Sequence, residues 1–283
     1  MKKILLVLLM VLVVAGSVLT GCGGTGAPST DQGLSGTVVI AGSTSVQPLS
    51  EELAAAFMSI NPNASIEVQG GGSGVGIKAA TDGVADIGAS SRDLKDTEKA
   101  GLTEYVIAKD GIAVIVNSSV TVTDLSLEKI KGIFTGEITN WKELGGADKP
   151  ITVVSREAGS GTRGAFIAIT GVESKDANGE NVDKTTDKSL IQPSQGAVMQ
   201  TVANTPDSIG YSSIGALDNT VTKVTIDGIE ASDANIISGT YKMARPFIYL
   251  TKGTESELAK AYIDFVLSAD GQAIVSANYI SVI

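Results

Sequence analysis

The feature that most restricts the fold of this sequence is the alternation of strand-like and helix-like segments near its start. Short apolar runs at 37–42, 65–70 and 85–90 are separated by segments with helical spacing at 48–60 and 74–81. This βαβαβ order predicts parallel strands with helices packed on the faces of the sheet. The sequence therefore predicts an α/β fold.

Each of these three strands is followed by a small polar loop. The loops read "GSTSVQP", "GGGSGVG" and "GASSRD" in chain order. In open α/β sheets, ligands bind beyond the carboxyl ends of the strands, where these loops would lie together. We therefore expect a binding site at this edge of the sheet.

The rest of the chain repeats the alternation and predicts a second unit. We expect strands at 110–119, 151–155, 208–213 and 243–253, and helices at 125–134, 164–169, 196–203 and 255–267. The last strand and helix are expected to return to the first unit. The polar stretch at 173–189 is typical of a solvated surface excursion.

Two crossings between two α/β units predict two lobes with a cleft between them. We expect residues 34–113 and 243–283 to form lobe I, and residues 114–242 to form lobe II.

The stretch "VVSREAGSGTRGAF" at 153–166 has the features of an anion-binding loop. Backbone N–H groups at a helix start have no internal partner, and the helix dipole adds partial positive charge there. Ser160 and Thr162 add hydroxyl donors, Gly161 allows close approach, and Arg156 can supply a forked, charged donor. The alternative is an ordinary N-capped helix with a surface arginine.

The N-terminus predicts export and anchoring. Lys2 and Lys3 precede an apolar run at 4–15, which is shorter than the roughly 20 residues of a spanning helix. "LTGC" resembles the bacterial lipobox, so we expect a signal peptide at 1–21, a lipid on Cys22 and a flexible tether at 22–33. The expected location is the extracytoplasmic face of the cell membrane. An uncleaved membrane anchor is the alternative.

Composition excludes several classes of function. The sequence has no histidine and one cysteine, so it cannot supply a Ser-His-Asp or Cys-His arrangement or the usual zinc ligands. Phosphate-loop and dinucleotide-binding motifs are missing, and we expect no metal, no cofactor and no enzymatic activity. Loss of residues 1–21 would lower the formal charge from −10 to −12, which argues against nucleic acid as a partner.

Motifs along nearly the whole mature chain resemble the phosphate-binding proteins of high-affinity phosphate ABC importers. They include "GSTSVQPL", "QGGGSGVGIKAATDGVADIGASSRDL", "DGIAVIVN", "GIFTGEITNWKELGG", "VSREAGSGTRGAF" and "SIGYSSIGAL". The resemblance implies a two-lobed periplasmic-binding-protein-like fold of type II. It also implies inorganic phosphate as ligand and membrane permease subunits as partners. The phosphate ligands it implies are Thr44, Ser45, Ser73, Arg156, Ser160, Gly161 and Thr162.

The sequence departs from the family at one position. The best-known members carry an aspartate that accepts the proton of hydrogen phosphate where this chain has Ser91 followed by Arg92. Such an acceptor would exclude sulfate, which has no proton to donate. We expect Ser91 and Arg92 to remain part of the site and Asp110 to take over as acceptor, with Glu157 and Asp93 as alternatives. Asp110 could instead be an ordinary Asp-Gly turn residue.

Three other functions stay open at this point. The same architecture could bind sulfate, molybdate or another oxyanion, and a surface adhesion or sensor protein could use the fold without import. A phosphatase would need a metal cluster or a nucleophile with a base, for which the sequence offers no residues.

Overall fold

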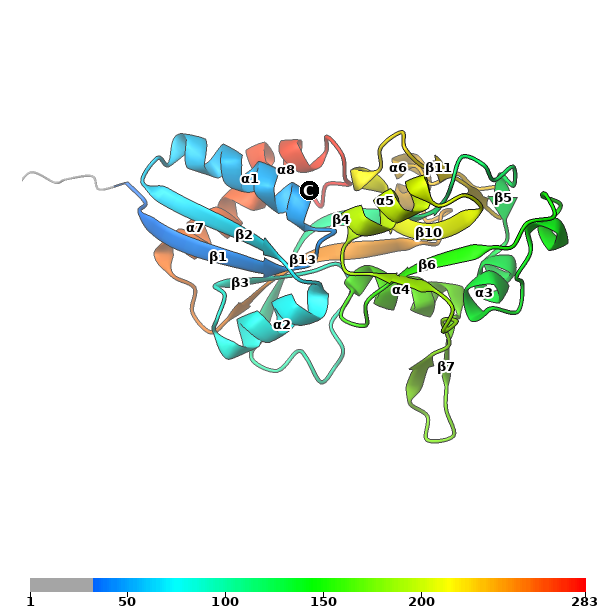
Figure 1. Cartoon of the computed structure of the whole chain (residues 1–283). Helices are drawn as coiled ribbons and strands as arrows, with labels where there is room; N and C mark the ends of the chain where they lie inside the picture. The colour runs from blue at the N-terminus through cyan, green and yellow to red at the C-terminus, as the bar shows by residue number, and fades with distance from the viewer. Residues whose placement is uncertain (1–32) are drawn as a thin grey trace, which may run out of the picture. The chain divides into compact units, whose positions relative to one another are not determined.

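A mixed sheet runs through the part of the chain that the computed structural model describes, residues 33–283, which form one compact unit (Figure 1). Its strand order is β2-β1-β3-β13-β4-β10-β6-β9, with β11 paired to β4. The strands are β1 (Gly36–Gly42), β2 (Ala64–Gly70), β3 (Ile87–Ser90), β4 (Leu102–Val116), β6 (Thr152–Arg156), β9 (Leu190–Gln192), β10 (Ser208–Ser213), β11 (Thr222–Lys223) and β13 (Ala244–Lys252).

The predicted βαβαβ unit is confirmed. Strand β1 pairs in parallel with both β2 and β3, and helices α1 (Gln47–Ile60) and α2 (Ser73–Asp82) connect the strands. Leu49, Leu53 and Phe57 of α1 are buried in the core. Their i, i+4 and i+8 spacing places them on one helix face, which explains why this amphipathic segment covers the sheet.

Two long strands cross the middle of the sheet. Strands β4 and β13 pair in antiparallel register over nine residue pairs, from Leu102↔Lys252 to Gly111↔Ala244. The expectation that a strand starts at residue 110 and ends at 119 was wrong, because β4 spans Leu102–Val116. Its first half mixes charged and apolar residues, so it lacks the continuous apolar run that marks the second half. It is a strand because β13 supplies its hydrogen-bonding partners.

The second half of the chain completes the sheet. Strand β10 pairs antiparallel with β4 and parallel with β6, and β9 pairs parallel with β6. Helix α4 begins at Gly161, three residues before the expected start at 164, because Ser160 caps it by accepting the N–H of Arg163. The remaining helices are α3 (Leu127–Thr135), α5 (Gln195–Asn204), α6 (Asp233–Ile237), α7 (Glu257–Val266), α8 (Ala269–Val275), η1 (Trp141–Leu144) and η2 (Ile214–Ala216).

Two large hydrophobic cores divide these elements. The first contains residues of β1, α1, β2, α7 and α8, and the second contains residues of α3, β6, α4, α5 and β10. Strand β4 contributes to both, since Ile107 lies in the first core and Ile112 in the second. Phe247 of β13 lies in the first core, and Met243, the residue just before β13, lies in the second. The two cores therefore meet near Asp110 of β4 and Arg245 at the start of β13, which face each other in register.

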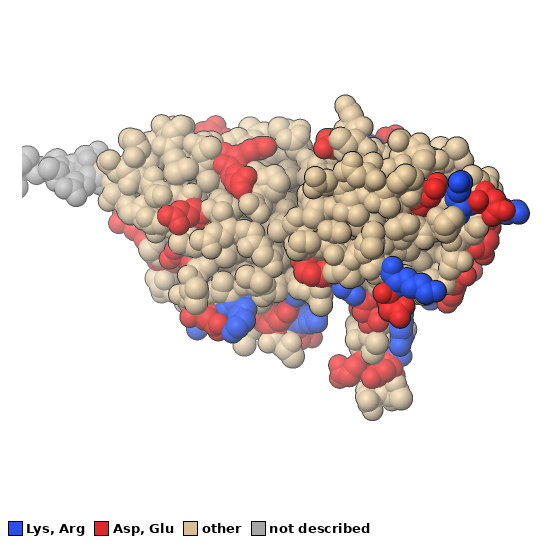
Figure 2. All heavy atoms as spheres, viewed as in Figure 1, with Lys and Arg blue, Asp and Glu red and all other residues tan. Residues whose placement is uncertain are grey.

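Four short strands form two small sheets outside the main sheet. The expected surface excursion at 173–189 contains a hairpin of β7 (Glu173–Lys175) and β8 (Asn181–Asp183), which projects from the rest of the structure (Figure 1). A further pair is β5 (Asp124–Leu125) with β12 (Thr225–Ile226). On the face shown in Figure 2, Lys and Arg side chains lie mainly along the lower edge and at the right-hand end.

The predicted signal peptide at 1–21, Cys22 and all but the last residue of the predicted tether lie outside the described residues. Among the helices of residues 33–283, none is long and apolar enough to cross a membrane.

Candidate anion-binding site

Three helices begin close together at the carboxyl ends of the strands. Helix α1 follows the loop after β1, α2 follows the loop after β2, and α4 follows the loop after β6. The start of α2 contacts the loop just before α4, because Gly74 donates its N–H to the carbonyl of Gly159 at 3.0 Å. A helix start carries unpaired N–H groups and about half a positive charge, so this arrangement favours an anion.

Hydroxyl groups from these loops meet in one buried cluster. Ser45 Oγ lies 2.6 Å from Thr162 Oγ1, although the two residues are 117 positions apart. Ser43 donates to Ser91 Oγ at 2.8 Å, and Ser73 Oγ accepts the N–H of Ser91 at 3.0 Å. Within the sequence-predicted set, the structure therefore brings Ser45, Ser73, Ser91 and Thr162 together. The Ser45 amide, which the resemblance implies as a ligand, donates to Ser43 Oγ at 3.2 Å.

Two glycines permit this close approach. A Cβ atom on Gly161 would stand 2.1 Å from Ser73 Oγ and 2.7 Å from Ser91 Oγ, so no larger residue fits against the cluster. Gly72, the N-cap of α2, has a φ of 91°, which L-residues with a side chain rarely adopt. The glycine-rich loops are therefore required by packing and by backbone conformation.

Arg156 lies inside the structure and reaches the same loops. Its side chain is 2% exposed, and its Nη2 donates to Thr44 Oγ1 at 3.1 Å. Glu157 accepts from Nε and Nη2, both at 2.8 Å, which fixes the plane of the guanidinium. The Tyr211 hydroxyl accepts the Arg156 N–H, and burial raises the pKa of Tyr211 to about 12, so this hydroxyl stays protonated. The alternative of a surface arginine is therefore wrong.

Asp110 is buried and does not form an Asp-Gly turn, because it lies within β4. Its Oδ1 accepts from the Ser213 hydroxyl at 2.7 Å, and its Oδ2 accepts from Arg245 Nε and Nη2 at 3.0 and 2.9 Å. Burial raises the pKa of the Asp110 carboxyl, while the Arg245 charge and the hydrogen bonds oppose this shift.

Arg245 was missed by sequence reasoning. It lies in β13 within the apolar run "MARPFIYL", and its Nη1 donates to Thr162 Oγ1 at 2.7 Å. The available signal was a lone arginine in an otherwise buried strand, because such a charge requires a partner.

Arg92 is placed differently from the other predicted ligands. Its Nη1 and Nη2 donate to both carboxylate oxygens of Glu98 at 2.7 and 2.8 Å, and this bond lowers the pKa of Glu98. Among the described residues, no hydrogen bond joins the Arg92 side chain to another predicted ligand. Its aliphatic part lies against the first turn of α4, since a Cβ on Gly164 would be 3.2 Å from Arg92 Cδ. Asp93, an alternative acceptor, is exposed.

Ser160 contributes to the loop mainly as a helix cap. Its side chain is buried, and its Oγ accepts the N–H of Arg163 at 3.1 Å.

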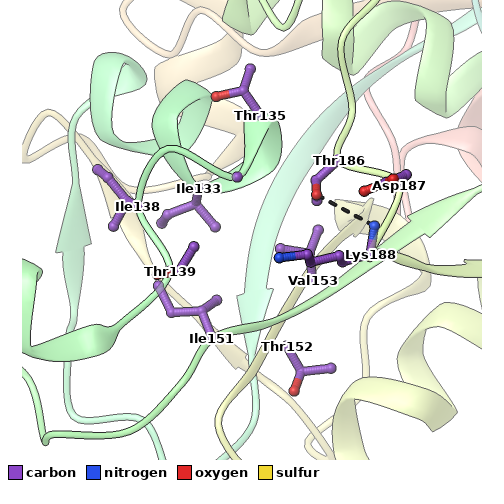
Figure 3. A pocket seen from close by; sticks show the side chains of 11 residues that line it. Ile133, Thr135, Ile138, Thr139, Ile151, Thr152, Val153, Thr186, Asp187 and Lys188 are labelled. Carbon is purple, nitrogen blue, oxygen red and sulfur yellow. Dashed lines mark hydrogen bonds between the residues drawn. The ribbon is translucent and has the colours of Figure 1, made fainter.

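A cavity of about 380 Å³ beside the cluster is lined by Arg92, Ser160, Arg163 and Gly164, among others. Another cavity of about 340 Å³ is bounded by α3, β6 and residues 186–188, and it contains none of the predicted ligands (Figure 3).

The arrangement presents donors much more than free acceptors. Each of the two buried arginines is paired with one carboxylate, so the two ion pairs add no net charge. Hydroxyl groups, backbone N–H groups and helix starts add to the attraction for an anion. In residues 33–283, no three His, Cys, Asp or Glu side chains are grouped as a metal site would require. The fold and this cluster define a two-lobed α/β protein whose polar donors converge where its two cores meet.

Comparisons with known proteins identify the family. The model of the PBP superfamily domain matches residues 27–270. The phosphate-binding protein PstS of Bacillus subtilis is 35% identical, with 100% of this chain and 95% of that protein covered. The phosphate-binding protein PstS 2 of Streptococcus agalactiae is 50% identical over 45% of this chain and 44% of its own length.

Solved structures agree with the sequence relatives. A crystal structure described as a phosphate ABC transporter substrate-binding protein with bound phosphate, from Clostridium perfringens, is 46% identical with a TM-score of 0.82. It is matched over 100% of its length by 88% of this chain. An ABC-type phosphate transport receptor from Vibrio cholerae is 34% identical with a TM-score of 0.71, and 86% of this chain covers 99% of it. The chain belongs to the PBP superfamily and, within it, to the PstS phosphate-binding proteins. The family resemblance and the fold class predicted from the sequence are confirmed.

Proposed function

We propose that this chain is a lipid-anchored, extracytoplasmic solute-binding protein that captures inorganic phosphate and delivers it to the membrane permease subunits of an ABC importer. The observation that carries the proposal is the buried cluster in which Ser45, Ser73, Ser91 and Thr162 meet beside Arg156 and three helix starts. A tetrahedral oxyanion offers acceptors in several directions, and this cluster supplies donors from several loops. The proposal assigns the chain no catalytic role.

The proposed binding event closes two lobes around the anion. We assign residues 34–113 and 243–283 to lobe I and residues 114–242 to lobe II. Support comes from the two hydrophobic cores, which meet near Asp110 of β4 and Arg245 of β13. Thr44 and Ser45 belong to one lobe, and their partners Arg156 and Thr162 belong to the other. An anion between these groups would hold the lobes together.

Calorimetry with phosphate, sulfate and molybdate on the unit from Gly33 tests the ligand. We expect tight phosphate binding and little sulfate binding. Arg156→Ala should weaken phosphate by roughly 2–5 kcal/mol, because it removes a buried charged donor. Arg156→Lys should recover only part of this loss, since it lacks the planar fork.

Lys78→Ala is the control for this series, because Lys78 is an exposed cation on α2 paired with Asp82. It should leave the affinity unchanged. Sulfate binding as tight as phosphate binding, or phosphate affinity in Arg156→Ala within about twofold of the parent, would contradict the proposal.

Anchoring through Cys22 is tested on the full-length chain in a membrane-containing host. The parent should be cut before Cys22 and carry lipid there, and Cys22→Ala should be released or misprocessed. Cys22→Ala should bind phosphate normally, because residue 22 precedes the unit that contains the site. Detection of an unmodified Cys22 within an uncleaved chain by mass spectrometry would disprove the anchor.

A further inference from the structure

Arg245 is a second buried arginine at the site. Its side chain is 1% exposed, as is that of its partner Asp110. The two residues face each other in the register of β13 and β4, close to where the two hydrophobic cores meet. The Phe247 ring lies 5.4 Å from the guanidinium carbon and helps to hold its plane.

One edge of the Arg245 guanidinium binds Asp110, and the other edge faces the hydroxyl cluster. Nε and Nη2 donate to Asp110, whereas Nη1 donates to Thr162 Oγ1 at 2.7 Å and to the Ser91 carbonyl at 3.3 Å. A guanidinium has five N–H groups. Four are accounted for by these bonds, and the fifth, on Nη2, has no partner among the described residues.

The bond from Arg245 occupies one of the two acceptor positions of the Thr162 hydroxyl. Because Thr162 Oγ1 accepts from Nη1, its own hydrogen is available for donation to a neighbour. That neighbour is Ser45 Oγ, 2.6 Å away, or an anion oxygen that enters between them. Arg245 therefore leaves the Thr162 hydrogen free to be donated at the point where the two lobes meet.

We propose that Arg245 is a second anion-binding arginine of this site, held in place by Asp110, which contacts an oxyanion bound between Ser45 and Thr162. The inference deepens the proposed function and rests on it. The competing explanation is a purely structural ion pair between β4 and β13. The two explanations predict different phosphate affinities when both charges are removed. A purely structural pair predicts no loss of affinity, whereas an anion-binding Arg245 predicts a large loss.

The decisive comparison is between Asp110→Asn and the double variant Asp110→Asn/Arg245→Met, both in the full-length chain. Asp110→Asn leaves the buried Arg245 charge unpaired, so adding Arg245→Met should raise the melting temperature of the ligand-free protein. If Arg245 binds the anion, the same change should weaken phosphate binding by at least about 30-fold relative to Asp110→Asn alone. Phosphate affinity equal to or tighter than that of Asp110→Asn would overturn the inference.

Arg245→Lys provides a second test that does not depend on the folding of the double variant. A lysine can pair with Asp110 but cannot span Asp110 and the anion with a planar fork. We expect phosphate affinity to fall by about tenfold, which corresponds to the loss of one good contact. A lysine variant with the affinity of the parent would show that the pair is structural.

Arg156→Ala and the anion panel distinguish failure of the proposed function from failure of the proposed role of Arg245. If the parent binds sulfate or molybdate and not phosphate, the proposed function fails, and the Arg245 variants are compared with that anion. If Arg156→Ala loses phosphate and Arg245→Lys does not, only the role of Arg245 is wrong.

Discussion

Both oxygens of the buried Asp110 carboxylate accept hydrogen bonds from neighbouring side chains. Its oxygens accept from Ser213 and from two nitrogens of Arg245, and a carboxylate has about four lone-pair positions. Little capacity is left for a phosphate proton. The role of Asp110 as direct acceptor of the phosphate proton stays a prediction. Its bonds to Arg245 give it a second possible contribution, which is to hold Arg245 in place beside the anion.

Asp110→Asn tests this role. If Asp110 accepts the phosphate proton, the amide should lower phosphate affinity by about 1–3 kcal/mol, the usual cost of unpairing one partner in a dry site. Sulfate should gain affinity, because the variant removes one negative charge. Calorimetry with both anions at pH 7 measures the change in preference.

Asp93→Asn is the matched control, because Asp93 is exposed and should leave the preference unchanged. Glu157→Gln tests the other carboxylate at the site and is less inert, since Glu157 holds Arg156 by two hydrogen bonds. An unchanged preference in Asp110→Asn, together with a loss in Glu157→Gln, would assign the acceptor to Glu157.

At the scale of elements, glycines decide how closely α2 approaches the sheet. A Cβ on Gly76 would stand 2.5 Å from the Ala41 carbonyl and 2.7 Å from the Ala89 carbonyl. A Cβ on Gly88 would stand 2.5 Å from the Gly76 carbonyl. This contact brings the start of α2, with Ser73, up to the ends of β1 and β3. The motif "GGGSGVG" therefore serves helix packing as well as ligand approach.

Gly76→Ala should lower the free energy of unfolding by about 1–3 kcal/mol, because the obstructing atoms are backbone and cannot turn away. Gly196→Ala in α5 is the control, since open space surrounds its Cβ position and alanine favours helix. The control should be neutral or up to about 1 kcal/mol more stable. Denaturant unfolding of both variants measures the difference, and equal stability would show that α2 shifts freely.

At the scale of the whole molecule, an acidic protein carries a site for an anion. The formal charge of the chain is −10, yet the two arginines of the site are each matched by one carboxylate. Salt screens distant charges over about 8 Å at physiological ionic strength. Local donors at the site, including N–H and O–H groups, can therefore outweigh the overall charge.

The sequence by itself determined the features that arise from local pattern. The βαβαβ alternation predicted parallel pairing of β1 with β2 and β3, and the small polar residues after each strand predicted where the loops would meet. The sequence also predicted a helix after the loop that contains Ser160, although it placed the helix start three residues late, at 164 and not at Gly161. Capping and dipole effects act within a few residues, so the helix itself could be predicted locally. These predictions depend on neighbours along the chain, so no knowledge of tertiary contacts was needed.

Only the tertiary structure decided which distant charges meet. Asp110 and Arg245 are 135 residues apart, and their contact depends on the register of β4 against β13. Arg92, by contrast, is taken up by Glu98, so its presence beside the "GAS" motif did not place it among the hydroxyl groups. Strand register and side-chain pairing follow from how both cores pack together, because a one-residue shift would turn every side chain to the other face. That information is absent from any single stretch of the sequence.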